Sequence, residues 1–193
     1  MARQYKACLK KVRRSSPPVP FLDELVDWAS YAPDVISTAK NDIYSNVLTE
    51  LGPYTSTLHR KAVMLEVLRV LAGIESTWHW NQGVDTTKTE IPTPENEETG
   101  AFQVSWDGMG NDQSLKDFVK KTFGKTDTKT FITNMKTHHQ FAIEYAARLF
   151  MVTLDANGPL GRPKFHHELS RDAVDEFMGF IFAWRERCEV ANW

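Results

Sequence analysis

The chain has 193 residues, of which 41% are hydrophobic and 25% charged. This length and hydrophobic content predict one domain with a single core. A formal net charge of only -2 excludes the general positive field that drives binding to nucleic acids or membrane surfaces. No segment is long and apolar enough to predict a transmembrane helix, and we expect a monomer without membrane insertion.

The first 20 residues are basic and rich in proline. Five cationic residues lie between Lys6 and Arg14, and three prolines follow by Pro20. This pattern predicts a loosely held arm over residues 1–20, ahead of one domain over residues 21–193. The arm lacks the apolar centre of a secretory signal peptide, so we expect synthesis without one. Cys8 and Cys188 are near opposite ends of the chain and are expected to be free thiols.

The remaining sequence predicts a mainly α protein. Helical periodicity is found from Phe21 to Ser30, from Asp34 to Leu51 and from Leu58 to Ile74, and the last of these is apolar enough to be the core helix. Gly52 and Pro53 form a stop signal for the second helix. After a loop over residues 81–99, apolar stripes predict helices around residues 115–123, 131–135 and 141–149, and a final helix capped by Ser170.

Glu75 follows the core helix on an apolar face. Counting back by three, four and seven residues gives Ala72, Leu71 and Leu68, which share that face in a helix. Desolvation there is expected to raise the pKa of Glu75 and keep a proton available for general acid catalysis. Glu66 makes the contrast: with Arg69 three residues on, it is expected to form an ordinary solvated ion pair without a function.

A short Gly-led segment follows the loop. Phe102 and Val104 alternate with Gln103 and Ser105, which predicts a strand with its apolar residues toward the core and its polar residues on the other side. A glutamine amide both donates and accepts hydrogen bonds, so Gln103 suits a sugar hydroxyl or N-acetyl group.

At these residues the sequence resembles the lysozyme-like superfamily, in the branch of goose-type lysozymes and soluble lytic transglycosylases. Glu75 and Ser76 match the catalytic Glu-Ser pair that ends the family's core helix, and residues 100–104 match its hairpin motif. Asn157, before Gly158, resembles the Asn-Gly turn bordering the cleft. The resemblance implies a lysozyme-like single domain, mainly α, with a buried core helix and a small β-hairpin at the active-site cleft.

The second carboxylate is less defined, because seven acids lie in or just after the loop. Glu98 is the first choice, since it lies two residues before Gly100, where the Gly-led segment starts, and Asp85 is the second. In the transglycosylase branch one Glu suffices, because the N-acetyl group and a hydroxyl of the substrate complete the reaction, so hydrolase and transglycosylase both stay open.

Aromatic residues flank the predicted cleft. Trp80 is a candidate for stacking on a sugar ring, while Ser76 and Ser105 are candidates for polar contacts with it. Neither the adjacent histidine pair at 138–139 nor the pair at 166–167 has zinc-ligand spacing, and the loop acids lack EF-hand order. We therefore expect neither a metal nor another cofactor.

The resemblance implies a peptidoglycan-degrading glycosidase, a muramidase or lytic transglycosylase, that cleaves the β-1,4 bond between MurNAc and GlcNAc with Glu75 as general acid. The partners are then peptidoglycan glycan strands, with an immunity or delivery partner if the protein is a secreted toxin. It would act at the bacterial cell wall, in the periplasm or outside the cell, after lysis or dedicated secretion. The alternatives are a chitinase- or chitosanase-like hydrolase of the same fold and a non-catalytic protein that binds glycan or a partner.

Overall fold

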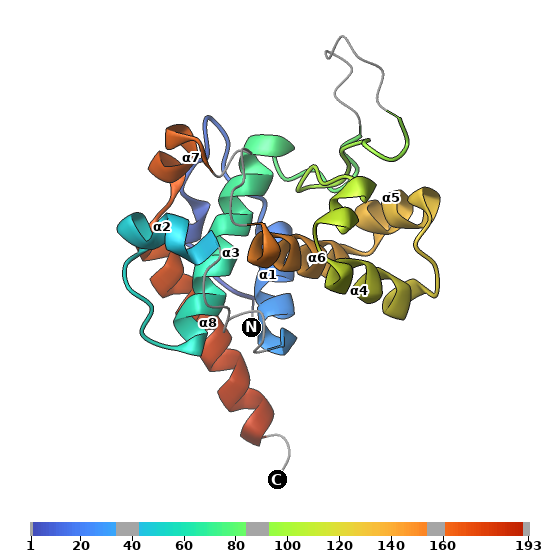
Figure 1. Ribbon diagram of the computed structural model, residues 1–193. Coiled ribbons are helices and arrows are strands. Elements are labelled where there is room, and N and C mark those ends of the chain that lie inside the picture. The colour runs from blue at the N-terminus through green and yellow to red at the C-terminus, as the bar shows by residue number, and fades with distance from the viewer. Residues whose placement is uncertain (1, 34–42, 84–92, 154–160, 191–193) are drawn as a thin grey trace.

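The protein is mainly α, as the sequence predicts. The computed structural model describes residues 2–33, 43–83, 93–153 and 161–190. Figure 1 shows α3 near the centre of the molecule, with α4 and α5 to one side of it next to α6. In chain order they are the 3-10 helix η1 (Ala7–Leu9), α1 (Val19–Tyr31), α2 (Ile43–Leu51), α3 (Thr57–Glu75), the 3-10 helix η3 (Trp106–Asn111), α4 (Gln113–Phe123), α5 (Thr128–Thr137), α6 (His139–Val152), α7 (Pro163–Glu168) and α8 (Arg171–Val190).

The central helix is α3. Ser56 caps it, because its hydroxyl accepts a hydrogen bond from the His59 amide at 3.1 Å. Every residue from Lys61 to Gly73 is buried, and the helix packs against α1, α2, α6, α7 and α8. The predicted core helix is therefore confirmed. None of the described helices is long and apolar enough to cross a membrane.

The ion pair predicted on α3, Glu66 with Arg69, does not meet solvent. The side chains of Glu66 and Arg69 are both 0% exposed, so the expected solvated pair is wrong. Arg69 donates to both carboxylate oxygens of Glu66, from Nε at 2.7 Å and from a terminal nitrogen at 2.8 Å. An i, i+3 spacing gives the same sequence pattern on a solvated or a buried face, and here other segments cover the pair.

Backbone groups from distant segments complete this buried pair. Arg69 donates to the Lys10 carbonyl at 2.9 Å and the Glu168 carbonyl at 3.5 Å, while Glu66 accepts from the Ser170 amide at 2.8 Å. Burial raises the pKa of the Glu66 carboxyl, and the attraction of Arg69 opposes that rise. Burial also disfavours the charge of Arg69, but the Glu66 carboxylate outweighs it and raises the guanidinium pKa. The charged pair thus depends on both partners being present.

The N-terminal segment is part of the core. Tyr5, Cys8 and Val12 are buried, so the expectation of a loosely held arm is wrong for this segment. The Glu176 carboxylate on α8 accepts hydrogen bonds from the backbone amides of Lys6 and Cys8, both at 2.7 Å. The apolar residues of the N-terminal segment are spaced among its cations, so the composition of the segment does not indicate that they are buried. Cys8 is a free thiol, and burial raises its pKa; the side chain of Cys188 lies outside the described residues.

Predicted helix ends agree with the structure where it describes them. Gly52 follows α2 with φ +83° and its amide donates to Leu48 O at 2.9 Å, as a glycine stop requires. Ser170 caps α8 through the Ala173 amide at 3.4 Å. Residues 34–42, the first part of the predicted second helix, lie outside the described residues.

The predicted β-hairpin is not found among the described residues. In its place Thr99 and Val104 form an isolated antiparallel bridge that closes a tight turn over residues 100–103. The alternation of apolar and polar residues is too short to separate a strand from such a turn.

Replacing Arg69 with Met should lower the free energy of unfolding by about 3–5 kcal/mol, because it leaves the Glu66 charge buried without its partner. The matched control is Arg148→Met on α6, whose ion pair with Glu144 is 26% and 20% exposed and should cost below about 1 kcal/mol. Urea unfolding of both variants measures the difference.

The loss in Arg69→Met should also shrink as the pH falls toward the ordinary glutamate pKa of about 4.3. Without Arg69 the Glu66 carboxyl loses the attraction that opposes the rise of its pKa, so the folded variant binds a proton more tightly than the folded parent and gains more stability as the pH falls. Equal losses in the two variants, or a loss independent of pH, would contradict this account of the pair.

Candidate functional site

Glu75 is the last residue of α3 and is half-buried. The chain then reverses through Thr77 and Trp78, which both have left-handed backbone conformations with φ 54° and 61°. The amides of Ser76 and Trp78 both donate to the Ala72 carbonyl at 3.0 Å. Strained non-glycine residues persist only where surrounding contacts hold them, so the end of α3 is fixed by its environment.

Trp78 supplies one of these contacts. Its indole Nε1 donates to the Arg69 carbonyl at 2.9 Å, and the ring lies so close to Gly73 that a Cβ there would be 2.6 Å from it. The same Cβ would lie 2.9 Å from Val12 of the N-terminal segment. Gly73 thus allows Trp78 and Val12 to pack against α3 two residues before Glu75.

The turn over residues 99–104 is equally constrained. Thr99 and Val104 exchange backbone hydrogen bonds at 3.1 and 3.3 Å. Gly100 has φ +73°, and its amide donates to the Gln82 carbonyl at 2.9 Å. Gln103 has φ 47°, and its side-chain amide nitrogen donates to the Gly100 carbonyl at 2.9 Å.

The expected alternation of this segment is only partly correct. Phe102 and Val104 are buried as predicted, but Ala101 is buried too, because the backbone turns where an extended strand was expected. Gln103 is half-buried and bonded within its own turn. It is therefore held next to Gly100, with its position set by the turn.

Ser76 joins the end of α3 to this turn. Its hydroxyl lies 2.8 Å from the Ala101 carbonyl and 3.0 Å from the Ala72 carbonyl, and it accepts from the His79 amide at 3.2 Å. The structure therefore brings together the two segments that carry the sequence motif. Ser76 is buried, and its hydroxyl is engaged in these hydrogen bonds, so in the structure it positions the turn.

Of the two candidates for the second carboxylate, Glu98 belongs to the described residues and Asp85 does not. Glu98 is half-buried and directly precedes the bridge residue Thr99, which places it at the start of the turn. Its neighbour Glu97 lies 3.9 Å from the Lys136 ammonium on α5. Asp85 lies outside the described residues, as does Asn157 of the predicted Asn-Gly turn.

Trp80 is half-buried in an aromatic cluster. The His139 ring stacks on its indole with centroids 4.1 Å apart and planes at 10°, while Phe21 lies 5.1 Å away. His139 in turn contacts Glu24, with Nδ1 and Oε2 2.6 Å apart, and burial raises the pKa of Glu24 against the opposing effect of His139. One face of the indole is therefore covered by the imidazole, which leaves less of the ring for sugar stacking.

Ser105 is at the N-cap of η3, and its hydroxyl donates to the Asp107 carboxylate. Among the residues that the structure describes, no group of three or more His, Cys, Asp or Glu residues is arranged to hold a metal ion.

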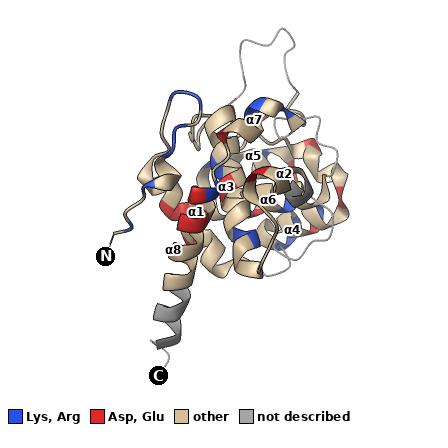
Figure 2. Cartoon of the chain, turned by 90° about the vertical axis from the view of Figure 1, so that its left-hand side faces the viewer, with Lys and Arg blue, Asp and Glu red and all other residues tan. Residues whose placement is uncertain are grey.

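A pocket of about 550 Å³ adjoins the end of α3 and was not predicted from the sequence. We call it the cationic pocket; its lining residues are Arg13, Ile74, Arg162, Pro163, Lys164, Phe165, His167 and Glu168. Figure 2 shows Lys and Arg in blue on the N-terminal turn and on α7, at the same end of the molecule. The sequence shows that the first segment is basic, but nothing in it indicates that these basic residues meet residues 162–168.

Comparisons with known proteins give no match: no family model matches the sequence, and neither a curated protein nor a solved structure matches the chain. The resemblance to the lysozyme-like superfamily therefore depends on the motif residues at Glu75, Ser76 and 100–104.

Replacing Gly100 with Ala should lower the free energy of unfolding by about 2–4 kcal/mol, through the cost of its positive φ and through a Cβ 2.8 Å from the Met135 carbonyl oxygen. Gly124→Ala is the matched control: Gly124 has φ +71°, but a Cβ there would meet nothing within 4 Å. It should cost only about 1 kcal/mol.

Thermal and urea unfolding of both variants measure these losses. The difference between them isolates the contact between the turn and α5. Equal losses would show that Met135 does not restrict the turn.

Proposed function

We propose that the protein is a glycosidase with a lysozyme-like fold that cleaves the β-1,4 bond between MurNAc and GlcNAc in peptidoglycan. The observation that carries the proposal is the Ser76–Ala101 hydrogen bond of 2.8 Å, which joins the helix end at Glu75 to the turn holding Gln103. A carboxyl beside a fixed polar turn is the arrangement that protonation of a glycosidic oxygen requires.

Glu75 acts as the general acid in this proposal. It ends a helix that is buried from Lys61 to Gly73, and it is itself half-buried. The strained turn at Thr77 and Trp78 fixes the direction in which the chain leaves it. Little reorganisation is then needed when a glycosidic oxygen approaches, which is what positioning contributes to catalysis.

Gln103 and Glu98 complete the proposed site from the other segment. The Gln103 nitrogen is held by Gly100, so its amide has a defined orientation toward a sugar hydroxyl or N-acetyl group. Glu98 at the start of the same turn is the candidate that stabilises the oxocarbenium-like transition state or activates a water. If the N-acetyl group of the substrate takes that part, Glu98 is not needed, and attack by the sugar's own hydroxyl on the anomeric carbon then gives an anhydro sugar.

The cationic pocket favours peptidoglycan over chitosan as the substrate. Ile74 belongs to the pocket and directly precedes Glu75, so a glycan long enough to extend from Glu75 to the Ile74 side of α3 would meet Arg13, Arg162 and Lys164. Chitosan carries an ammonium on each deacetylated sugar and would be repelled there. Peptidoglycan carries carboxylates and would be attracted.

Glu75→Gln should lower the initial rate of clearing of purified peptidoglycan by about 10²–10⁴-fold, because the amide cannot donate the acid proton. Glu97→Gln is the control: Glu97 belongs to the same region and pairs with Lys136, but it has no part in the proposed chemistry. It should retain the parent rate.

Comparable clearing by Glu75→Gln and the parent would refute the proposal. Clearing by neither of them, alongside binding of glycan, would favour the non-catalytic alternative. The Glu98→Gln variant separates the two mechanisms, because it should be slow only if a protein carboxylate stabilises the transition state.

A further inference from the structure

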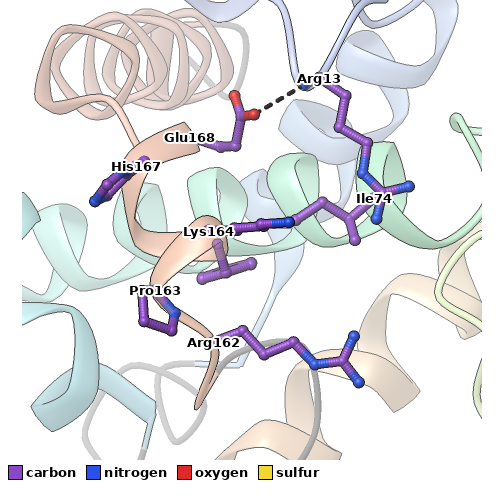
Figure 3. A pocket seen from close by; sticks show the side chains of 8 residues that line it. Arg13, Ile74, Arg162, Pro163, Lys164, His167 and Glu168 are labelled. Atoms are coloured by element: carbon purple, nitrogen blue, oxygen red, sulfur yellow. Dashed lines mark hydrogen bonds between the residues drawn. The ribbon is translucent and has the colours of Figure 1, made fainter.

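The cationic pocket is built from three parts of the chain that α3 holds together. Arg13 comes from a turn closed by the Val12–Ser15 bridge, and its backbone amide donates to the Glu168 carboxylate at 3.0 Å. α7 supplies Lys164 and the residues around it, and α3 supplies Ile74. Figure 3 shows Arg13 and Arg162 on the same side of the pocket with Ile74 between them.

The cations of this pocket have no carboxylate partner among the described residues. Arg3, Arg69 and Arg148 each pair with a carboxylate in this part of the chain. The side chains of Arg13, Arg162 and Lys164 form no ion pair with any described residue. Glu168 is the one carboxylate among the described lining residues, and the Arg13 backbone amide already binds it. The pocket therefore has an excess of positive charge.

The floor of the pocket is apolar. Phe165 is buried and Ile74 is half-buried, so apolar groups lie beside the cations in the lining. Solvated surface cations are common, but a concave site of about 550 Å³ with unpaired guanidinium groups selects a ligand that combines carboxylates with small apolar groups. A single inorganic anion would leave the apolar floor unused.

We propose that the cationic pocket binds the carboxylates of the stem peptide that peptidoglycan carries on its MurNAc residues. This inference rests on the proposed function, because it uses the position of the pocket beside Glu75. The stem peptide is joined to the lactyl group of MurNAc, next to the bond that would be cleaved, and it combines alanine methyl groups with free carboxylates. The pocket would thereby orient the glycan and select peptide-bearing strands.

The test is a calorimetric titration of the full-length Glu75→Gln protein, which binds without cutting if Glu75 is the acid. The probes are a purified GlcNAc–MurNAc disaccharide with a tripeptide stem, the same disaccharide without peptide, and inorganic phosphate. The tripeptide form should bind at least about tenfold more tightly than the bare disaccharide, and phosphate should bind more weakly than either.

Charge reversal tests whether the cationic pocket causes the preference for the tripeptide form. Arg162→Glu with Lys164→Glu, in the Glu75→Gln background, should abolish the preference for the tripeptide form. The milder pair Arg162→Gln with Lys164→Gln covers the case in which reversal disturbs folding. Lys116→Glu with Lys120→Glu on α4 makes the same change in charge at exposed residues outside the pocket and should keep the preference.

Equal affinity for the two disaccharides, or a preference that survives the substitutions at 162 and 164, would overturn the inference. Phosphate affinity equal to that of the tripeptide form would also overturn it, since the pocket would then be a general anion site. Catalysis is measured separately on whole and peptide-stripped glycan strands with the parent protein. Cleavage of neither substrate would refute the proposed glycosidase, while the binding titrations would still decide what the pocket recognises.

Discussion

The buried ion pair between Glu66 and Arg69 is the constraint on which the rest of the structure depends. Both charged side chains belong to α3 and are buried, so water cannot solvate them. Each charge therefore needs hydrogen-bond partners from the protein. Arg69 reaches the carbonyls of Lys10 and Glu168, and Glu66 accepts from the Ser170 amide. One pair of side chains therefore holds the N-terminal segment, the end of α7 and the start of α8 against the central helix.

Arg69 contacts both parts of the proposed site. Its backbone carbonyl accepts a hydrogen bond from the Trp78 indole, which holds the reversal after Glu75, and the Ser76 hydroxyl binds the Ala101 carbonyl of the turn. The Arg69 side chain binds the two sides of the cationic pocket, since Lys10 precedes the Arg13 turn and Glu168 ends α7. The charged side chain thus positions the pocket, while the backbone of the same residue helps to position the candidate acid.

Local chemistry explains what the sequence could predict. The stop at Gly52 and the cap at Ser170 depend on neighbouring residues only, and the apolar run before Glu75 identifies the core helix. The motif around Glu75 and Gly100 correctly indicated that the two segments meet. Burial of Glu66 could not be predicted, because its covering groups are up to 104 residues away. The same holds for the turn at Gly100, whose shape depends on Met135, and for Arg13, which meets α7 only in the folded chain.

We propose that the helix end at Glu75 and the turn at Gly100 form a site that cleaves the glycan of peptidoglycan. Mass analysis of the products from purified peptidoglycan tests this cleavage. We expect soluble muropeptides cut between MurNAc and GlcNAc, with hydrated reducing ends if a water attacks and anhydro ends if the sugar's own hydroxyl does. Glycan strands that stay intact after incubation with the folded protein would contradict it.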